Sequence, residues 1–317
     1  MNNKALLLHL GLSKTGSSTL QKALFRKHPQ IYYLGKFANK GMSIRKCQDD
    51  LTYRILNPVL WDLDEPMDMD ATLSLFQDKL MPKIPEDQVL VGSWENLGNR
   101  SIEHHREILN RSKAIFGSCR LLVTLRNPLS RLPSLYMQNL FEHFLWENQD
   151  WMDHECYEDI ELWYKIRTAR VKDPMLGYTD WIQSSIKQLG RENVGIFLFE
   201  DLQENPSAYY QSICQFMGID ANIGVSLTQD KHFNPRLSEA QLAYIRKTQS
   251  TYLKRKLHSL YSLKRREMAL EAQLSSSNAK IVLPNNLVDE VSDETRDCHR
   301  WLVDNLKLPL EKYGYPL

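Results

Sequence analysis

The chain has 317 residues, of which 42% are hydrophobic, and a formal net charge of +1. A chain of this size can bury one large core or two small ones, and we expect a single α/β domain. The near-neutral charge excludes a general electrostatic attraction to nucleic acid or to a membrane surface. Five cysteines lie scattered, without the spacing of a zinc site or a disulfide framework, which is typical of reduced thiols in a cytoplasm.

The apolar run after Lys4 does not have the pattern of an export signal. It is too short, lacks a small-residue cleavage site, and continues directly into a polar loop. No segment approaches transmembrane length. We therefore expect a cytoplasmic protein that does not insert into a membrane.

Short apolar runs recur between stretches with helical spacing. The runs that predict strands are Ala5–Leu10, Val89–Gly92, Leu121–Leu125 and Val194–Phe199. Strands that alternate with helices imply a parallel sheet with right-handed crossovers. We expect a single domain over residues 1–317, with helical insertions at about 35–80 and 140–180 and a basic helical segment at about 240–272.

The first predicted strand ends in a loop of small residues that begins at Gly11. Ser17, Ser18 and Thr19 then open a helix, where unpaired N–H groups and the helix dipole favour a bound phosphate. A triphosphate P-loop needs lysine at position 17, but here the lysine is displaced to Lys14, inside the loop. The sequence therefore predicts an anion site that is not a triphosphate clamp, with an ordinary N-capped helix as the alternative.

A second anion-binding pattern follows the third predicted strand. Arg126 comes at the carboxyl end of that strand, where ligands of open α/β sheets bind. Pro128 suits the first position of a helix, which places Ser134 about two turns along, just after a kink at Pro133. A guanidinium binds phosphate oxygens at two points, and a serine hydroxyl adds a further hydrogen bond. Two separate phosphate sites predict a nucleoside that carries phosphates at two positions.

Together these patterns resemble the motifs of the sulfotransferase family, which uses 3′-phosphoadenosine 5′-phosphosulfate (PAPS) as its sulfuryl donor. The family's 5′-phosphosulfate loop, with its run of small hydroxyl residues, is matched by Lys14, Thr15, Gly16, Ser17, Ser18 and Thr19. Its 3′-phosphate motif is matched by Arg126, Pro128, Ser134 and Tyr136. The resemblance is closest to the bacterial and glycan-modifying branch. It implies a three-layer, P-loop-NTPase-like α/β fold, PAPS as co-substrate, 3′-phosphoadenosine 5′-phosphate (PAP) as product, and no metal.

Sulfuryl transfer needs a base for the acceptor's proton and positive charge at the oxygen that departs. We expect Lys14 to supply the charge. Glycan-modifying sulfotransferases place a glutamate base near the second predicted strand, and Glu95 stands there, next to Trp94, which would partly desolvate it. His104 and His105 are the alternative bases, because other branches of the family use histidine.

The later part of the chain contributes two further patterns. Arg236 lies in a loop that, by the same resemblance, closes over the 3′-phosphate; the alternative is a turn in which Ser238 caps the next helix. From Ala240 to Arg266 there are eight Lys or Arg and no acid. The apolar spacing there predicts one basic amphipathic helix over about 244–266, either as a solvated face or as a surface for an acidic ligand.

The acceptor is less well defined. Residues 35–75 and four tryptophans are expected to wall its pocket, unless the tryptophans simply pack in the core: Trp146, Trp151, Trp163 and Trp181. Aromatic faces suit sugar rings, so a glycan hydroxyl is the first choice and a phenol or lipid the alternative. From other classes, a P-loop nucleotide kinase or a non-enzymatic nucleotide-binding protein stays open. The missing lysine at position 17 and the second phosphate site argue against the kinase.

Overall fold

The computed structural model describes residues 4–36, 47–95, 100–146, 152, 154–171, 176–231, 237–275 and 277–317. The chain divides into two compact units. Unit 1 comprises Met1–Arg126 and Tyr178–Phe233, and unit 2 comprises Asn127–Gly177 and Asn234–Leu317. The assignment of the whole chain to one domain stays a prediction.

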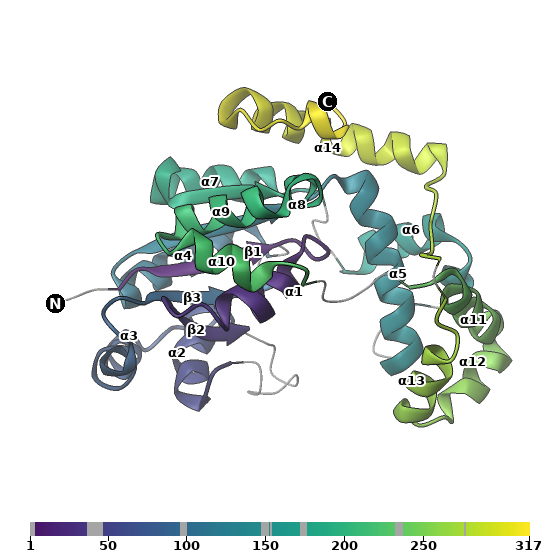
Figure 1. Ribbon diagram of the computed structural model, residues 1–317, viewed down its shortest axis with the longest axis horizontal. Coiled ribbons are helices and arrows are strands. Elements are labelled where there is room, and N and C mark those ends of the chain that lie inside the picture. Colours follow the sequence, from purple (N-terminus) through teal and green to yellow (C-terminus); the bar gives the residue numbers. More distant parts are fainter. Residues whose placement is uncertain are drawn as a thin grey trace. The chain divides into compact units, whose positions relative to one another are not determined.

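Unit 1 contains a five-stranded parallel sheet in the order β2-β3-β1-β4-β5 (Figure 1). Its strands are β1 (Leu6–Gly11), β2 (Ile31–Lys36), β3 (Val89–Ser93), β4 (Cys119–Leu125) and β5 (Val194–Leu198). The predicted parallel α/β architecture is confirmed, and so are all four predicted strands. The sequence pattern misses β2, which lies at one edge of the sheet.

Helices flank this sheet. Those of unit 1 are α1 (Ser17–Thr19), η1 (Leu20–Phe25), α2 (Asp50–Leu60), α3 (Met69–Ser74), η3 (Leu75–Leu80), η4 (Met81–Lys83), α4 (Ile102–Phe116), α7 (Thr179–Leu189), η7 (Arg191–Asn193), α8 (Phe199–Glu204), α9 (Pro206–Met217) and α10 (Ala221–Thr228). Apolar side chains of β1, β3 and β4 pack with η1 and α9 in one core cluster, which includes Leu7, Val91 and Leu122. This core fixes β1 and the helix after it, so the loop between them has two rigid ends.

Unit 2 is helical in its described residues and has a core of its own, which includes Tyr136, Trp163 and Ile245. Its helices are α5 (Pro128–Trp146), η6 (Glu155–Tyr157), α6 (Ile160–Val171), α11 (Glu239–Gln249), α12 (Tyr252–Ser259), α13 (Leu263–Glu271), α14 (Asn285–Leu306) and η8 (Glu311–Tyr313). As predicted, α5 begins at Pro128, and one helix continues through Pro133.

The prediction of one basic helix over about 244–266 is wrong, because the segment forms α11, α12 and α13. Thr251 and Ser262 each begin a new helix: the Thr251 side chain accepts from the N–H of Lys254, and the Ser262 side chain accepts from the N–H of Arg265. A side-chain oxygen that satisfies a free N–H is a strong helix start. The apolar spacing therefore does not describe one continuous face.

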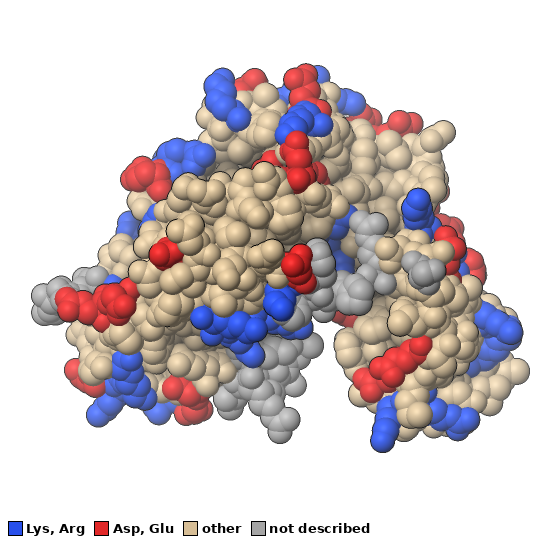
Figure 2. Space-filling model, viewed as in Figure 1, with Lys and Arg blue, Asp and Glu red and all other residues tan. Residues whose placement is uncertain are grey.

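The remaining expectations concern surface charge, the four tryptophans and membrane-spanning segments. On the face drawn in Figure 2, scattered groups of Lys and Arg lie among groups of Asp and Glu, and most of the surface between them carries neither. Trp163 and Trp181 are buried, which favours core packing for these two, whereas Trp146 is exposed. Trp151 lies outside the described residues. Among the helices that the structure describes, none is both long and apolar enough to span a bilayer.

Candidate functional site

The loop between β1 and α1 has the strand, loop and helix order that the sequence predicts. Two of its residues have left-handed backbone: Lys14, with φ 70°, and Gly16, with φ 86°. A Cβ on Gly16 would lie 3.0 Å from Leu202 Cδ2, so glycine is favoured here both by its conformation and by the space available. Left-handed backbone at a lysine is unusual and concentrates at functional sites. The loop backbone therefore has a specific conformation that glycine at position 16 permits.

The hydroxyl residues of the loop divide into two sets. Thr15 is fully buried, and its hydroxyl donates to the carbonyl of Leu12 at 2.6 Å. Ser17 is also buried, with its Oγ 3.4 Å from Thr15 Oγ1. Ser18 is only half-buried, as are Lys14 and Gly16. The Thr15 hydroxyl therefore stabilises the loop from inside, and its backbone N–H is the part suited to a ligand.

The arginine of the second pattern lies against this loop. Arg126 Nη1 donates to the carbonyl oxygen of Lys14 at 3.0 Å, and the guanidinium carbon lies 4.5 Å from the ring centroid of Phe199. Arg126 is the last residue of unit 1, whereas Ser134 belongs to unit 2, where it is buried in α5. The role of both in binding a 3′-phosphate stays a prediction.

Arg236, the third residue predicted to bind the 3′-phosphate, lies outside the described residues. The cap that was its structural alternative is present: Ser238 accepts from the N–H of Gln241, and the Gln241 side chain accepts from the N–H of Ser238. This reciprocal capping box explains why α11 begins at Glu239. It leaves the role of Arg236 as a prediction.

Glu95 follows the carboxyl end of β3 and forms an ion pair with Lys36, the last residue of β2. Trp94, beside it in sequence, is buried with its ring centroid 5.0 Å from that of Trp61. Lys36 is a charged residue that sequence reasoning missed, because β2 itself was not predicted. The available signal was the β-rich run Ile31–Tyr33 that precedes it.

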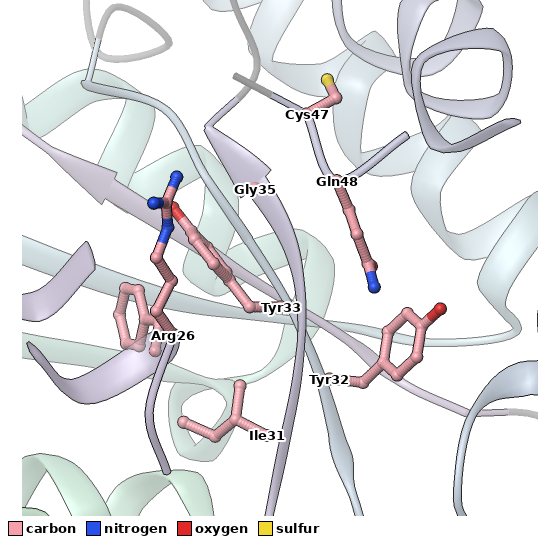
Figure 3. A pocket seen from close by; sticks show the side chains of 8 residues that line it. Arg26, Ile31, Tyr32, Tyr33, Gly35, Cys47 and Gln48 are labelled. Atoms are coloured by element: carbon pink, nitrogen blue, oxygen red, sulfur yellow. The ribbon is translucent and has the colours of Figure 1, made fainter. Parts of the chain in front are cut away.

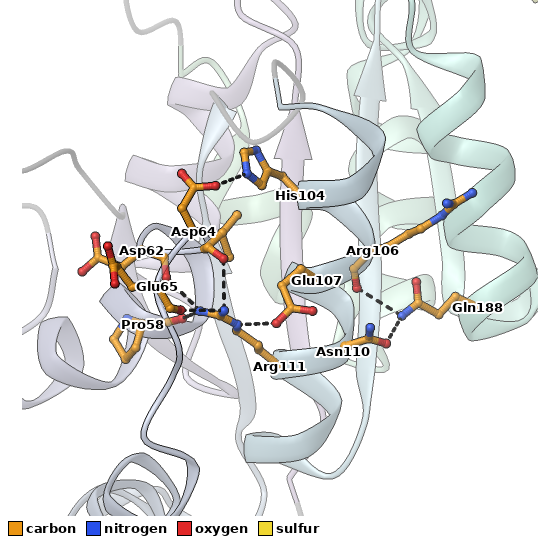
Figure 4. A network of polar contacts seen from close by, with 11 residues as sticks. Pro58, Asp62, Asp64, Glu65, His104, Arg106, Glu107, Asn110, Arg111 and Gln188 are labelled. Atoms are coloured by element: carbon orange, nitrogen blue, oxygen red, sulfur yellow. Dashed lines mark hydrogen bonds and ion pairs between the residues drawn. The ribbon is translucent and has the colours of Figure 1, made fainter.

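The two alternative bases lie near the start of α4 and have other partners; Figure 4 shows His104 beside Asp64. His104 Nε2 lies 3.1 Å from Asp64 Oδ1. His105 is buried and stacks on Trp181, with ring centroids 5.0 Å apart and planes 6° from parallel. Burial, together with the charges of Arg100 and His104, lowers the pKa of His105 to about 4. His105 thus has the surroundings of a packed core residue.

Figure 4 also shows what holds this region together. Arg111 of α4 pairs with Glu107 and donates to four carbonyl oxygens, that of Pro58 in the last turn of α2 and those of Asp62, Leu63 and Glu65 in the segment after it. A guanidinium that satisfies this many carbonyls fixes a turn that has no regular structure. It is therefore a structural network, and it positions Asp64 beside His104.

A pocket of about 430 Å³ lies along β2 (Figure 3). The residues that line it are Phe25, Arg26, Ile31, Tyr32, Tyr33, Gly35, Cys47 and Gln48. The Arg26 guanidinium points toward the Tyr33 hydroxyl (Figure 3). Gly35 directly precedes Lys36, the partner of Glu95. The pocket thus combines aromatic rings, one cation and an amide, and its lining is adjacent in sequence to the residue that pairs with the candidate base.

Comparison with known proteins identifies one family. The sulfotransferase domain family matches residues 6–269. A crystal structure of a sulfotransferase from Alicyclobacillus acidocaldarius matches with 16% identity and a TM-score of 0.45, over 85% of this chain and 95% of that chain. A sulfotransferase domain from the curacin biosynthetic pathway matches with 14% identity and a TM-score of 0.44, over 87% and 99%. A mouse sulfotransferase complexed with PAP matches with 15% identity and a TM-score of 0.40, over 95% and 89%. A search of curated protein sequences finds no match.

Proposed function

The chain belongs to the sulfotransferase domain family, and on that premise we propose that it transfers the sulfuryl group of PAPS to an acceptor hydroxyl. The observation that carries this proposal is the loop from Gly11 to Thr19. It has left-handed backbone at Lys14 and Gly16, which supports its assignment as an anion-binding loop, and its lysine stands inside the loop, at Lys14. A cation there suits the oxygen that bridges phosphate and sulfate, rather than the β- and γ-phosphates of a nucleotide.

The proposed reaction is an in-line displacement at sulfur. The acceptor oxygen forms a bond to sulfur while the bond from sulfur to the 5′-phosphate oxygen breaks, and PAP leaves. Lys14 stabilises the negative charge on the departing oxygen, and Glu95 takes the proton of the acceptor hydroxyl. Backbone N–H groups of residues 15–19 bind the 5′-phosphate, supported by the hydroxyls of Ser17, Ser18 and Thr19. Arg126, Ser134 and Arg236 are proposed to bind the 3′-phosphate.

Glu95 is the proposed base in preference to His104 and His105. Its ion pair with Lys36 supports this choice, because an ammonium at the end of β2 holds the carboxylate at the carboxyl edge of the sheet, where ligands of parallel sheets bind. His105 is sequestered in packing against Trp181. His104 is the remaining competitor and is tested below.

A glycan hydroxyl is the proposed acceptor. The pocket along β2 supports this, because Tyr32 and Tyr33 supply ring faces of the kind that stack on sugars, while Arg26 and Gln48 supply hydrogen-bond donors. A cation in the lining favours a sugar that already carries an acidic group.

The test is a transfer assay with radiolabelled PAPS and purified protein across glycans, phenols and lipids. We expect label on a glycan, with an undiminished rate in EDTA, since no metal takes part in the mechanism. Exclusive labelling of a phenol or lipid would overturn the glycan acceptor. Phosphate transfer from a nucleoside triphosphate that EDTA abolishes, with no binding of PAP, would instead identify a kinase.

A further inference from the structure

A chain of hydrogen-bonded side chains lies buried beneath the loop and has no part in the reaction proposed above. It crosses three strands, with Ser93 on β3, His9 on β1 and Thr124 on β4. His9 Nδ1 lies 2.8 Å from Ser93 Oγ, and His9 Nε2 lies 3.4 Å from Thr124 Oγ1. At one end Gln21 of η1 donates to Ser93 Oγ at 2.9 Å; at the other, Thr15 Oγ1 lies 2.7 Å from Thr124 Oγ1. We call these five residues the relay, and all five are buried.

The number of hydrogens that each side chain carries fixes the direction of hydrogen-bond donation along the relay. Thr15 has a single hydroxyl hydrogen and donates it to the carbonyl of Leu12. The contact between the two threonines therefore requires the Thr124 hydroxyl to donate to Thr15. Thr124 then has no hydrogen left for His9, so it accepts from the ring. His9 consequently carries its proton on Nε2.

The other end of the relay agrees with this tautomer. With its proton on Nε2, His9 has a lone pair on Nδ1 that accepts from the Ser93 hydroxyl. Ser93 Oγ in turn accepts from the Gln21 amide. The order of donation is thus Gln21, Ser93, His9, Thr124 and Thr15, ending at the carbonyl of Leu12. Every donor in the sequence meets an acceptor, which is what buried polar groups require.

The surroundings of His9 keep the ring neutral and in place. Burial, with the nearby charge of Lys36, lowers the pKa of His9 to about 3. The ring packs edge-on against Phe25, with centroids 5.6 Å apart. An imidazolium would carry a second N–H at Nδ1 and would force the Ser93 hydroxyl to reverse. The directed relay therefore exists only with neutral His9.

Gly11 gives independent support. A Cβ at this position would lie 2.5 Å from Thr124 Oγ1, 2.6 Å from Ser17 Oγ and 3.0 Å from His9 Nε2. The end of β1, from which the loop continues, thus lies directly over the relay, close enough that only glycine fits. The backbone of His9 is also bonded to the segment that follows β3: the N–H of Trp94, next to Glu95, donates to the carbonyl of His9 at 3.0 Å.

We propose that His9, as the neutral Nε2–H tautomer, is a positioning residue that holds the loop in its donor-binding shape and fixes it to the end of the strand that precedes Glu95. The inference rests on the proposed function, because the shape of the loop matters through the 5′-phosphate it binds. His9 itself touches neither donor nor acceptor. Its effect passes through Thr124 and Thr15 to the loop backbone.

The first test is the tautomer, which needs no ligand. The measurement is NMR of the protein with ¹⁵N-labelled histidine, in which the His9 signals are assigned by their loss in His9→Phe. These signals should show a protonated Nε2 and an unprotonated Nδ1. They should not change between about pH 5 and pH 8, where an ordinary histidine titrates. A proton on Nδ1, or titration within that range, would overturn the proposal.

The second test is PAP binding by calorimetry, with the full chain and PAP alone as the probe. His9→Phe keeps the ring, and Thr124→Val keeps the volume; each breaks the relay at one point, and we expect each to weaken PAP binding by roughly tenfold. The double variant should bind no more weakly than either single variant, because one break already disconnects the loop. The control is Thr52→Val, which removes another fully buried hydroxyl of unit 1, outside the relay.

Thr52→Val should change the thermal midpoint but not the affinity for PAP. If all three single variants lose affinity for PAP in proportion to the fall in their thermal midpoints, the relay is merely structural and the positioning role is wrong. If the unsubstituted protein binds no PAP, the proposed donor is wrong instead. In that case the tautomer measurement still decides whether the directed relay exists.

Discussion

The substitution Glu95→Gln separates chemistry from binding at the candidate active site. Glutamine keeps the size of the side chain and loses the group that takes up a proton. General base catalysis contributes about 10²–10⁴-fold to rate, so we expect kcat to fall by that factor, which is roughly 3 to 5 kcal/mol of transition-state stabilisation. The affinity for PAP should not change, because the 5′-phosphate is proposed to contact the loop, not Glu95.

The effect on stability should be much smaller. The side chains of Lys36 and Glu95 are 32% and 18% exposed, so the ion pair is partly solvated. Pairs of this kind contribute at most about 1 kcal/mol, and the amide of glutamine still offers Lys36 an acceptor oxygen. A loss of rate by 10²-fold or more, beside a loss of about 1 kcal/mol or less in unfolding free energy, cannot be attributed to partial unfolding.

The assay is single-turnover transfer from radiolabelled PAPS, with PAP affinity and urea unfolding measured on the same preparations. His104→Gln is the matched control, since it removes the competing imidazole from the contact with Asp64. We expect it to keep a rate close to that of the unsubstituted protein. If Glu95→Gln keeps most of its rate, Glu95 is not the base; if His104→Gln loses the rate instead, the base is the histidine.

Three further predictions concern the loop and the helix α4. Lys14→Met should slow single-turnover transfer by about 10²–10³-fold, because the departing oxygen loses its cation; a normal rate with weakened PAP binding would indicate that Lys14 only binds the donor. Gly16→Ala should cost about 1–2 kcal/mol in urea unfolding and abolish PAP binding, since φ is 86° and the new Cβ would lie 3.0 Å from Leu202 Cδ2; unchanged calorimetric titrations would contradict this geometry. His105 should destabilise the protein in acid: below its ordinary pKa of 6.5 only the unfolded state takes up the proton, so unfolding free energy falls by up to about 1.4 kcal/mol per pH unit until the folded pKa of about 4 is reached. His105→Phe should keep the stacking on Trp181 and give a shallower fall, and an identical pH profile would refute the buried neutral state.

The parts of the fold that the sequence revealed are those with a local physical signature. Buried parallel strands are continuous apolar runs, so β1, β3, β4 and β5 were predicted. The edge strand β2 has a different pattern, Ile-Tyr-Tyr-Leu-Gly-Lys, and its register with β3 is irregular between Tyr33 and Gly35. It was missed, and Lys36 was missed with it. In unit 2, periodicity alone joined three helices into one because it gave no weight to the capping oxygens of Thr251 and Ser262.

The candidate site likewise has parts that the sequence predicts and parts that it does not. Lys14, Gly16 and Arg126 stand in short motifs whose spacing can be recognised, but the carbonyl that Arg126 contacts could not be read from spacing. His9 looked like one more residue of an apolar strand. Its partners lie 84 and 115 positions along the chain, and only the register of β1 with β3 and β4 brings them together.

One local and one long-range hydrogen bond explain how the loop keeps its shape without the lysine that a triphosphate P-loop carries at position 17. The Thr15 hydroxyl and the Arg126 guanidinium each bind a carbonyl of the loop, at Leu12 and Lys14. Both bonds come from the protein, so the left-handed backbone at Lys14 is stabilised before any donor arrives. A loop shaped in advance spends less binding free energy on ordering itself. In the proposed mechanism the Lys14 side chain acts on the departing oxygen, while the hydrogen bonds of Thr15 and Arg126 hold the loop backbone.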